Sequence, residues 1–97
     1  MLDLKSVFEK WNDEYTKFDR VENPRHPCPD VCAFLLLNEL APVKRGVDMV
    51  SAGEHDEIWL ATKVEDVAKV ATEEQIVELI RCGVRFCSQY EAFAMFV

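Results

Sequence analysis

The first segment of the chain, Asp3 to Phe18, carries apolar residues at steps of three and four. Such spacing places one apolar stripe along the face of an α-helix, with charged residues on the other side. Asp3 is also a residue type that commonly caps a helix N-terminus. The pattern therefore predicts one amphipathic helix over this segment. Its apolar stripe consists of Leu4, Val7, Phe8, Trp11, Tyr15 and Phe18.

A proline-rich loop follows and leads into a strongly apolar helix. Pro24, Pro27 and Pro29 each remove a backbone donor and restrict the residue before them, which predicts irregular chain from residue 21 to residue 29. Pro29 suits the first turn of a helix, and Pro42 prevents a helix from continuing. We therefore expect a helix from residue 29 to about residue 40. Because residues 31–37 are all apolar, it should be the most buried element.

The middle of the chain mixes strand and helix signals. Residues 58–60, Ile-Trp-Leu, are typical of a strand, and residues 49–51 are a candidate for a short strand before it. Thr62 and Glu65 have the spacing of a capping box, in which a hydroxyl and a carboxylate satisfy two free amides at a helix start. This predicts a short helix after Thr62. Its inner stripe would be Val64, Val67, Ala68 and Ala71.

The last third of the chain predicts one more helix and a hairpin. Thr72 and Gln75 repeat the capping-box spacing, and Gly83 is a natural C-terminal stop. Residues 84–87 and 92–97 then read as two strands joined around residues 88–91. We predict one α+β domain, residues 1–97, in which a small antiparallel sheet of about three strands carries about four packed helices.

Composition agrees with a small soluble protein. Apolar residues make up 49% of the chain and charged residues 30%. The longest apolar run is seven residues, against about 20 for a membrane-spanning helix. The N-terminus also lacks the basic, apolar and small-residue regions of a signal peptide. The sequence thus predicts a cytoplasmic protein without membrane contact.

Charge points toward a protein partner. The net charge is −7, and the basic residues are scattered, with Lys44 and Arg45 the only adjacent pair. Direct binding of nucleic acid needs clustered basic residues, so we do not expect it. An acidic surface suits a partner with a basic surface. Residues 54–97 hold nine acidic and four basic residues, a balance of −5. The candidate partner-binding residues are Glu54, Asp56, Glu57, Glu65, Asp66, Glu73 and Glu74.

The cysteines do not have the spacing of a typical zinc site. Three residues separate Cys28 from Cys32 and four separate Cys82 from Cys87, whereas structural zinc sites favour two, and His26 is the nearest imidazole. Disulfides are rare in a cytoplasmic chain. The sequence leaves open whether these four cysteines are core thiols or ligands, and we expect no metal and no cofactor.

Catalytic motifs are also missing. A reactive cysteine needs a base and an orienting residue, and only the neighbourhood of His26 and Cys28 offers the first. The three serines have no nucleophile-elbow context, and the three glycines form no phosphate-binding loop. The sequence therefore favours binding over catalysis, and we expect no enzyme.

The carboxyl-terminal half resembles small acidic proteins encoded by bacteriophages and prophages. The resemblance lies in residues 54–60, 72–75, 81–86 and 94–97, and residues 30–40 fit it as well. Size, acidity and the lack of a catalytic motif also resemble anti-CRISPR proteins. Some of those, including inhibitors of type I-F surveillance complexes, occupy a DNA-binding surface. The resemblance implies a phage or prophage inhibitor whose acidic surface acts as a local DNA mimic on a host defence complex, such as a CRISPR surveillance complex.

Two alternatives stay open. One is a protein-interaction module that uses an apolar patch, to which Trp59, Tyr90 and Phe93 would contribute if they face outward. The other is a small zinc or thiol protein built on the cysteines.

Overall fold

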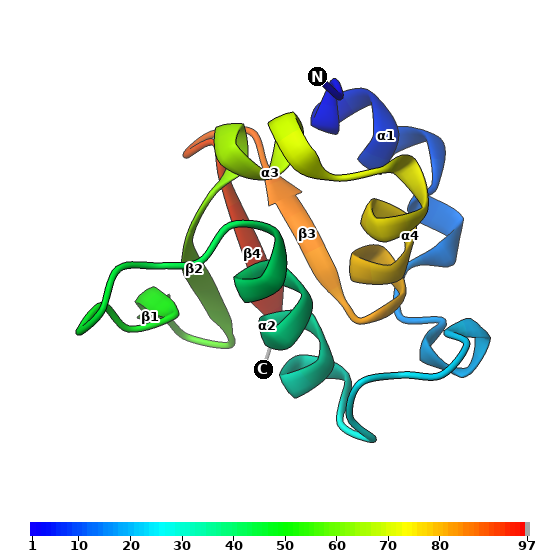
Figure 1. Ribbon diagram of the computed structural model, residues 1–97, viewed down its shortest axis with the longest axis horizontal. Helices are drawn as coiled ribbons and strands as arrows, with labels where there is room; N and C mark the ends of the chain where they lie inside the picture. The colour runs from blue at the N-terminus through cyan, green and yellow to red at the C-terminus, as the bar shows by residue number, and fades with distance from the viewer. Residues whose placement is uncertain (97) are drawn as a thin grey trace.

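The computed structural model describes residues 1–96. Over this range the chain forms four α-helices, two short 3₁₀ helices and one four-stranded sheet (Figure 1). None of these helices is both long and apolar enough to cross a membrane. The elements in chain order are α1 (Leu4–Lys10), η1 (Asn12–Glu14), η2 (Phe18–Arg20), α2 (Pro29–Leu40), β1 (Val50–Glu54), β2 (Glu57–Lys63), α3 (Val64–Val70), α4 (Glu73–Arg81), β3 (Val84–Cys87) and β4 (Ala92–Phe96).

The sheet is antiparallel throughout, with strand order β1-β2-β4-β3. The predicted α+β class is confirmed. The sheet has four strands instead of about three, because residues 50–54 form a full strand that pairs with β2. The predicted hairpin of β3 and β4 is confirmed as far as residue 96, and residue 97 lies outside the described residues.

Register decides which side chains share a face of the sheet. Met95 lies opposite both Ile58 and Val84, and this row contacts the core. Ala94 lies opposite both Trp59 and Arg85, and this row faces away from it. Since successive side chains of a strand point to opposite faces, the sheet has an inner face covered by helices and an outer face without them.

The inner face and the helices enclose one apolar cluster. Phe93 of β4 has no exposed surface, and its ring lies 6.1 Å from that of Phe8 on α1. Helix α2 buries Leu36 and Leu37 completely, but Leu35 is 46% exposed. The helix thus meets the cluster on one side only, although residues 31–37 are all apolar.

The predicted helix from Asp3 to Phe18 is wrong in its length. Asp3 caps the helix as predicted, but α1 ends at Lys10. Trp11 leaves the helical region at φ −110° and ψ 22°, and Thr16 has a φ of 61°. The apolar spacing is still used, since Tyr15 and Phe18 pack against the core from turns and 3₁₀ helices. The side chains of the predicted apolar stripe thus reach the core although the helix is not continuous.

One of the two predicted capping boxes forms. The Thr72 hydroxyl accepts from the Gln75 amide at 3.2 Å, and the Gln75 side chain accepts from the Thr72 amide at 2.9 Å. The box predicted at Thr62 is wrong, because Thr62 is a buried residue of β2 and α3 begins after Lys63. Gly83 follows α4 with a φ of 96°, which fits its predicted role as the helix stop.

Candidate protein interaction surfaces

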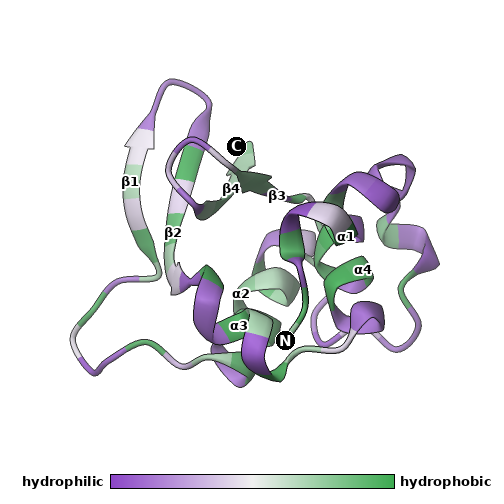
Figure 2. Ribbon diagram, turned by 90° about the horizontal axis from the view of Figure 1, so that it is seen from above, coloured by the Kyte–Doolittle hydropathy of each residue, from purple (hydrophilic) through white to green (hydrophobic). Residues whose placement is uncertain are grey.

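The hairpin of β1 and β2 carries four polar residues at its tip. Glu54 and Glu57 are paired across the hairpin, and His55 takes a φ of 54° in the turn between them. Figure 2 shows this tip as a hydrophilic loop at one end of the hairpin. Glu57 forms an ion pair with Arg85. Within residues 1–96, no Lys or Arg pairs with Glu54 or Asp56, and the only ion-pair contact of Glu54 is with the imidazole of His55, at 3.9 Å. The tip therefore presents two carboxylates without a Lys or Arg partner.

The other predicted contact residues lie at the starts of two helices. Glu65 and Asp66 are exposed in the first turn of α3, where the helix dipole favours them. Glu73 accepts from the Trp11 indole at 2.8 Å and from the Lys10 ammonium at 3.0 Å. The Trp11 bond and then the Lys10 bond lower the pKa of Glu73. The Glu73 carboxylate is therefore already bound by Trp11 and Lys10 of the same chain.

The structure does not gather these carboxylates into one patch. The hairpin tip lies at one end of β2, and α3 begins at the other end. Six residue steps of a strand span about 20 Å. Only Glu54, Asp56 and Glu57 come together, and the acids of α3 form a separate group. A partner that contacts both groups must therefore be large.

Aromatic residues lie on the outer face of the sheet beside the hairpin tip. Phe96 is 57% exposed and Tyr90 is 62% exposed. The rings of Tyr90 and Trp59 meet edge to face at 5.9 Å. Phe93, expected as a possible contact, is buried in the core instead, because its position in β4 points to the inner face. Phe96 was missed in the sequence, since its direction depends on the register of β4.

A shallow hollow joins Trp59 and Phe96 to the acidic tip. It has a volume of about 280 Å³. Arg85 reaches its edge, with the guanidinium 4.1 Å from the centre of the Phe96 ring and in an ion pair with Glu57. The hollow combines ring faces with carboxylates, which is the chemistry that binds a cationic side chain. Its lining residues are Glu54, His55, Asp56, Glu57, Trp59 and Phe96.

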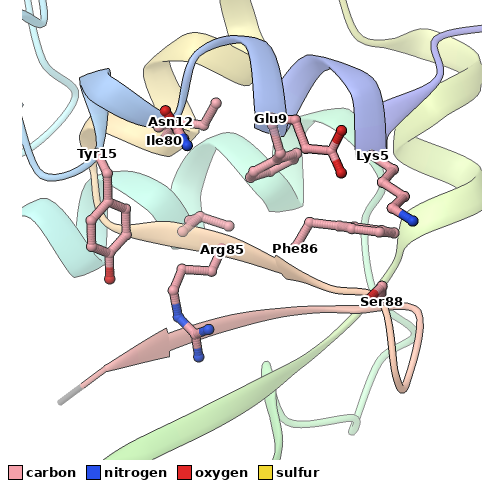
Figure 3. Close-up of a pocket in the computed structure, with 10 residues that line it drawn as sticks. Lys5, Glu9, Asn12, Tyr15, Ile80, Arg85, Phe86 and Ser88 are labelled. Carbon is pink, nitrogen blue, oxygen red and sulfur yellow. The ribbon is translucent and has the colours of Figure 1, made fainter.

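A second hollow lies between α1 and the free edge of β3. Its volume is about 370 Å³, and Figure 3 shows α1 running along one side and β3 along the other. Its lining includes both apolar and polar residues. We call this hollow the α1–β3 groove. Its apolar lining is Phe8, Ile80, Val84 and Phe86, and its polar lining includes Lys5, Glu9, Asn12, Arg85 and Ser88.

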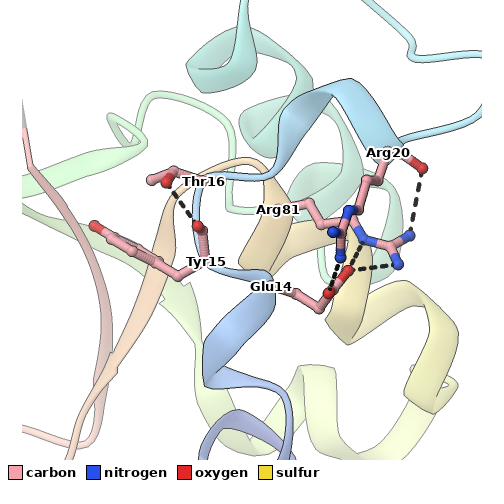
Figure 4. A network of polar contacts seen from close by, with 5 residues as sticks. All are labelled: Glu14, Tyr15, Thr16, Arg20 and Arg81. Atoms are coloured by element: carbon pink, nitrogen blue, oxygen red, sulfur yellow. Dashed lines mark hydrogen bonds and ion pairs between the residues drawn. The ribbon is translucent and has the colours of Figure 1, made fainter.

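Most arginines serve the fold. Glu14 is buried and accepts from Arg81 at 2.8 Å and from Arg20 (Figure 4). The Arg81 bond is the main cause that lowers the pKa of Glu14. Arg25 joins Glu39 of α2 at 3.0 Å and Glu78 of α4 at 2.7 Å. The proline-rich loop, which carries Arg25, is thereby tied to two helices.

The cysteines divide into two buried and two accessible thiols. Cys32 and Cys82 are buried, and burial raises the pKa of Cys82 to about 12. Cys28 is exposed and Cys87 is half-buried. The His26 imidazole accepts from the Cys28 amide at 3.0 Å, a bond that fixes the loop. In the part of the chain that the structure describes, no three His, Cys, Asp or Glu residues group as metal ligands.

Comparison with protein-family models, with curated proteins and with solved structures found no match for this chain. Its function is therefore argued from its own surfaces.

Proposed function

We propose that this protein is a phage or prophage binding protein that occupies a basic, nucleic-acid-binding surface of a host protein complex. A CRISPR surveillance complex in the host cytoplasm is such a target. The hairpin tip and the adjoining outer face of the sheet are the contact surface. The protein acts by occupying the site, and its own residues carry out no chemical step.

One observation carries the proposal: the available carboxylates of Glu54 and Asp56 line a hollow that also contains aromatic rings. Carboxylates pair with Lys and Arg through charge-assisted hydrogen bonds, and ring faces attract the same cations. Basic residues that hold DNA phosphates are cations of this kind. The carboxylates of the tip could therefore take the place of DNA phosphates on a DNA-binding surface. The aromatic rings beside them would add apolar contacts.

Arg85 supports this assignment from within the molecule. Its guanidinium lies on the Phe96 ring and pairs with Glu57 at the edge of the same hollow. The protein thus already stabilises one guanidinium with the aromatic and acidic groups that a partner's arginine would use. Glu54 and Asp56 remain for that second cation.

The test uses a tagged protein, pull-down from a bacterial lysate, and elution by duplex DNA. The variant Glu54→Lys/Asp56→Lys reverses the tip, and Glu65→Lys/Asp66→Lys reverses the start of α3. Asp13→Lys/Glu22→Lys makes the same change in net charge at two exposed sites elsewhere. We expect DNA to displace a nucleic-acid-binding complex, and the tip variant to bind it on the order of tenfold more weakly than the control variant. Equal binding by the tip variant and the control would contradict the proposal.

A second candidate function is a module that binds through the outer face without imitating DNA. The Trp59 indole Nε1 favours it, because this donor is buried and has no acceptor within residues 1–96. An acceptor from a partner would satisfy it, while Tyr90 and Phe96 would become buried. Salt separates the two functions. Binding that depends on the carboxylates weakens as salt rises, whereas apolar binding changes little.

A further inference from the structure

Strand β1 forms a free and uncovered edge of the sheet. It pairs with β2 on one side only, at the end of the strand order, and all five of its residues are exposed. Within the described chain, no other backbone hydrogen bond reaches residues 50–54. Proteins protect such edges with Pro, Lys, a bulge or a covering element. Of these devices β1 has only a register shift, between Val50 and Ala52, so its outward N–H and C=O groups are open to another strand.

The loop between α2 and β1, residues 41–49, gives one end of this edge a positive charge. Lys44 and Arg45 are exposed and form no ion pair in residues 1–96, and Asp48 is the one acidic residue of the loop. Lys44 also lines a hollow of about 280 Å³ with Lys63 and Asp66, whose charges cancel. The start of β1 therefore lies beside a net positive surface.

The hairpin tip gives the other end of the edge a negative charge. Figure 2 shows the tip and the α2–β1 loop at opposite ends of β1. Glu54 and Asp56 have no Lys or Arg partner, whereas Glu57 is neutralised by Arg85. When two such strands pair antiparallel, the tip of each lies beside the start of the other. Two copies of β1 would thus join opposite charges at both ends of the contact.

These features together select a second copy of the chain as the occupant. A matching strand needs a free edge, an acidic end and a basic end, in the reverse order. A uniformly acidic or uniformly basic strand would suit one end of β1 and oppose the other, whereas β1 of a second copy meets all three requirements. Val47 is 47% exposed and Val50 is 39% exposed, and both lie along this edge, where a second copy would remove them from water.

We propose that the protein forms a two-fold dimer by antiparallel pairing of β1 with β1 of a second copy, which joins the two sheets into one. Lys44 and Arg45 of each copy pair with Glu54 and Asp56 of the other. Because one short strand buries little surface, we expect a dissociation constant on the order of 100 μM. The inference does not rest on the proposed function, but a second copy and the proposed partner would compete for the same two carboxylates.

The first test uses the purified wild-type protein. Sedimentation equilibrium from about 10 μM to about 1 mM should show a monomer that becomes a dimer. Over the same range, NMR shifts should move with concentration in residues 43–56, and amide hydrogen exchange should slow within residues 50–54. These measurements need no variant, so they do not depend on whether a substitution folds.

Reversal of charge tests the pairing itself. Lys44→Glu/Arg45→Glu makes both ends of the edge acidic, and Glu54→Lys/Asp56→Lys makes both ends basic. Each variant alone should dimerise on the order of tenfold more weakly than a control of equal net charge. In an equal mixture of the two variants, opposite charges meet again at both ends. A mixed dimer should therefore form with an affinity within about threefold of the wild type.

The controls make the same changes in net charge at exposed sites away from β1. Lys17→Glu/Lys69→Glu matches the loop variant, and Asp13→Lys/Glu22→Lys matches the tip variant. Net charge alone would strengthen self-association of the tip variant, because that variant is less acidic than the wild type. Weaker association of the tip variant than of its control is therefore specific to the edge.

Four results would overturn the inference: a wild-type monomer at about 1 mM, a dimer whose shifts lie outside residues 43–56, variants that dimerise as well as their controls, and a mixture that associates no better than either variant alone. Lys44→Glu/Arg45→Glu leaves the tip unchanged. It should lose self-association and still be able to capture the host complex, so failure of the dimer and failure of the proposed function are seen separately.

Discussion

Thiol reactivity tests the division of the cysteines into two buried and two accessible groups. Brief exposure of the folded protein to iodoacetamide at pH 8 should modify Cys28 first and Cys87 next. Cys32 and Cys82 should remain unmodified. The thiolate is the reactive form, so both its population and its accessibility determine the rate.

The magnitude follows from burial and pKa. A rise in pKa from the ordinary value of 9.0 to about 12 lowers the thiolate fraction of Cys82 about a thousandfold. Reaction therefore proceeds mainly through molecules in which the site has opened, where the ordinary pKa returns. A domain of this size has an unfolding free energy of roughly 5 kcal/mol or more, which limits full opening to about one molecule in several thousand. Both routes predict modification of Cys82 on the order of a thousandfold slower than that of Cys28.

The assay is a time course with digestion and mass spectrometry of each cysteine-containing peptide. A sample in concentrated urea is the control, and there all four thiols should react at similar rates. The variant Cys28→Ser should remove the fastest phase and leave the others unchanged. Similar rates for all four cysteines in the folded protein would refute the burial of Cys32 and Cys82 between α2 and α4.

Four further substitutions probe single interactions. Thr72→Ala should lower the free energy of unfolding by about 1 kcal/mol in urea titrations because it removes a helix cap. Thr62→Val should cost little or even stabilise, because the buried Thr62 hydroxyl has no partner within residues 1–96, and equal losses from both substitutions would contradict this contrast. Phe93→Ala should cost about 3–5 kcal/mol in the same titrations, and a loss below about 1 kcal/mol would place Phe93 outside the core. The lowered pKa of Glu14 stabilises the fold above its ordinary value of 4.5, and this contribution is lost as the pH falls below it. Glu14→Gln should therefore lower the melting temperature near pH 7 and flatten its pH dependence below pH 5, and an unchanged profile would exclude Glu14 as a source of acid sensitivity.

The bounds of two helices could be predicted from the sequence, because residues at their ends determine where the helix begins and stops. Pro29 and Pro42 delimit α2, and Thr72 with Gly83 delimits α4, because these residues act on the backbone beside them. Thr62 shows the limit of this reasoning. Its spacing to Glu65 is that of a capping box, but pairing of β2 with β4 places it inside the sheet. Long-range strand pairing overrides a local preference of about 1 kcal/mol.

The candidate surfaces depended on information that the sequence does not hold. Composition identified the acidic residues as candidates. Glu57 and Glu73 differ from the others because they form ion pairs within the protein, with Arg85 and Lys10. These pairs join residues far apart in the chain, so no spacing rule could reveal them. The positions of Phe93 and Phe96 differ in burial because of the register of β4. A shift by one residue would exchange their faces.

The exposed edge strand has a consequence for the motions of the molecule. All five residues of β1 are exposed, so its attachment rests on the backbone hydrogen bonds to β2 and on little apolar contact. Strand β4, by contrast, is held on both sides and buries Phe93. Separation of β1 from β2 therefore requires much less free energy than opening of the core. The carboxylate of Glu54 thus belongs to a segment that can open and close many times during the lifetime of one folded molecule.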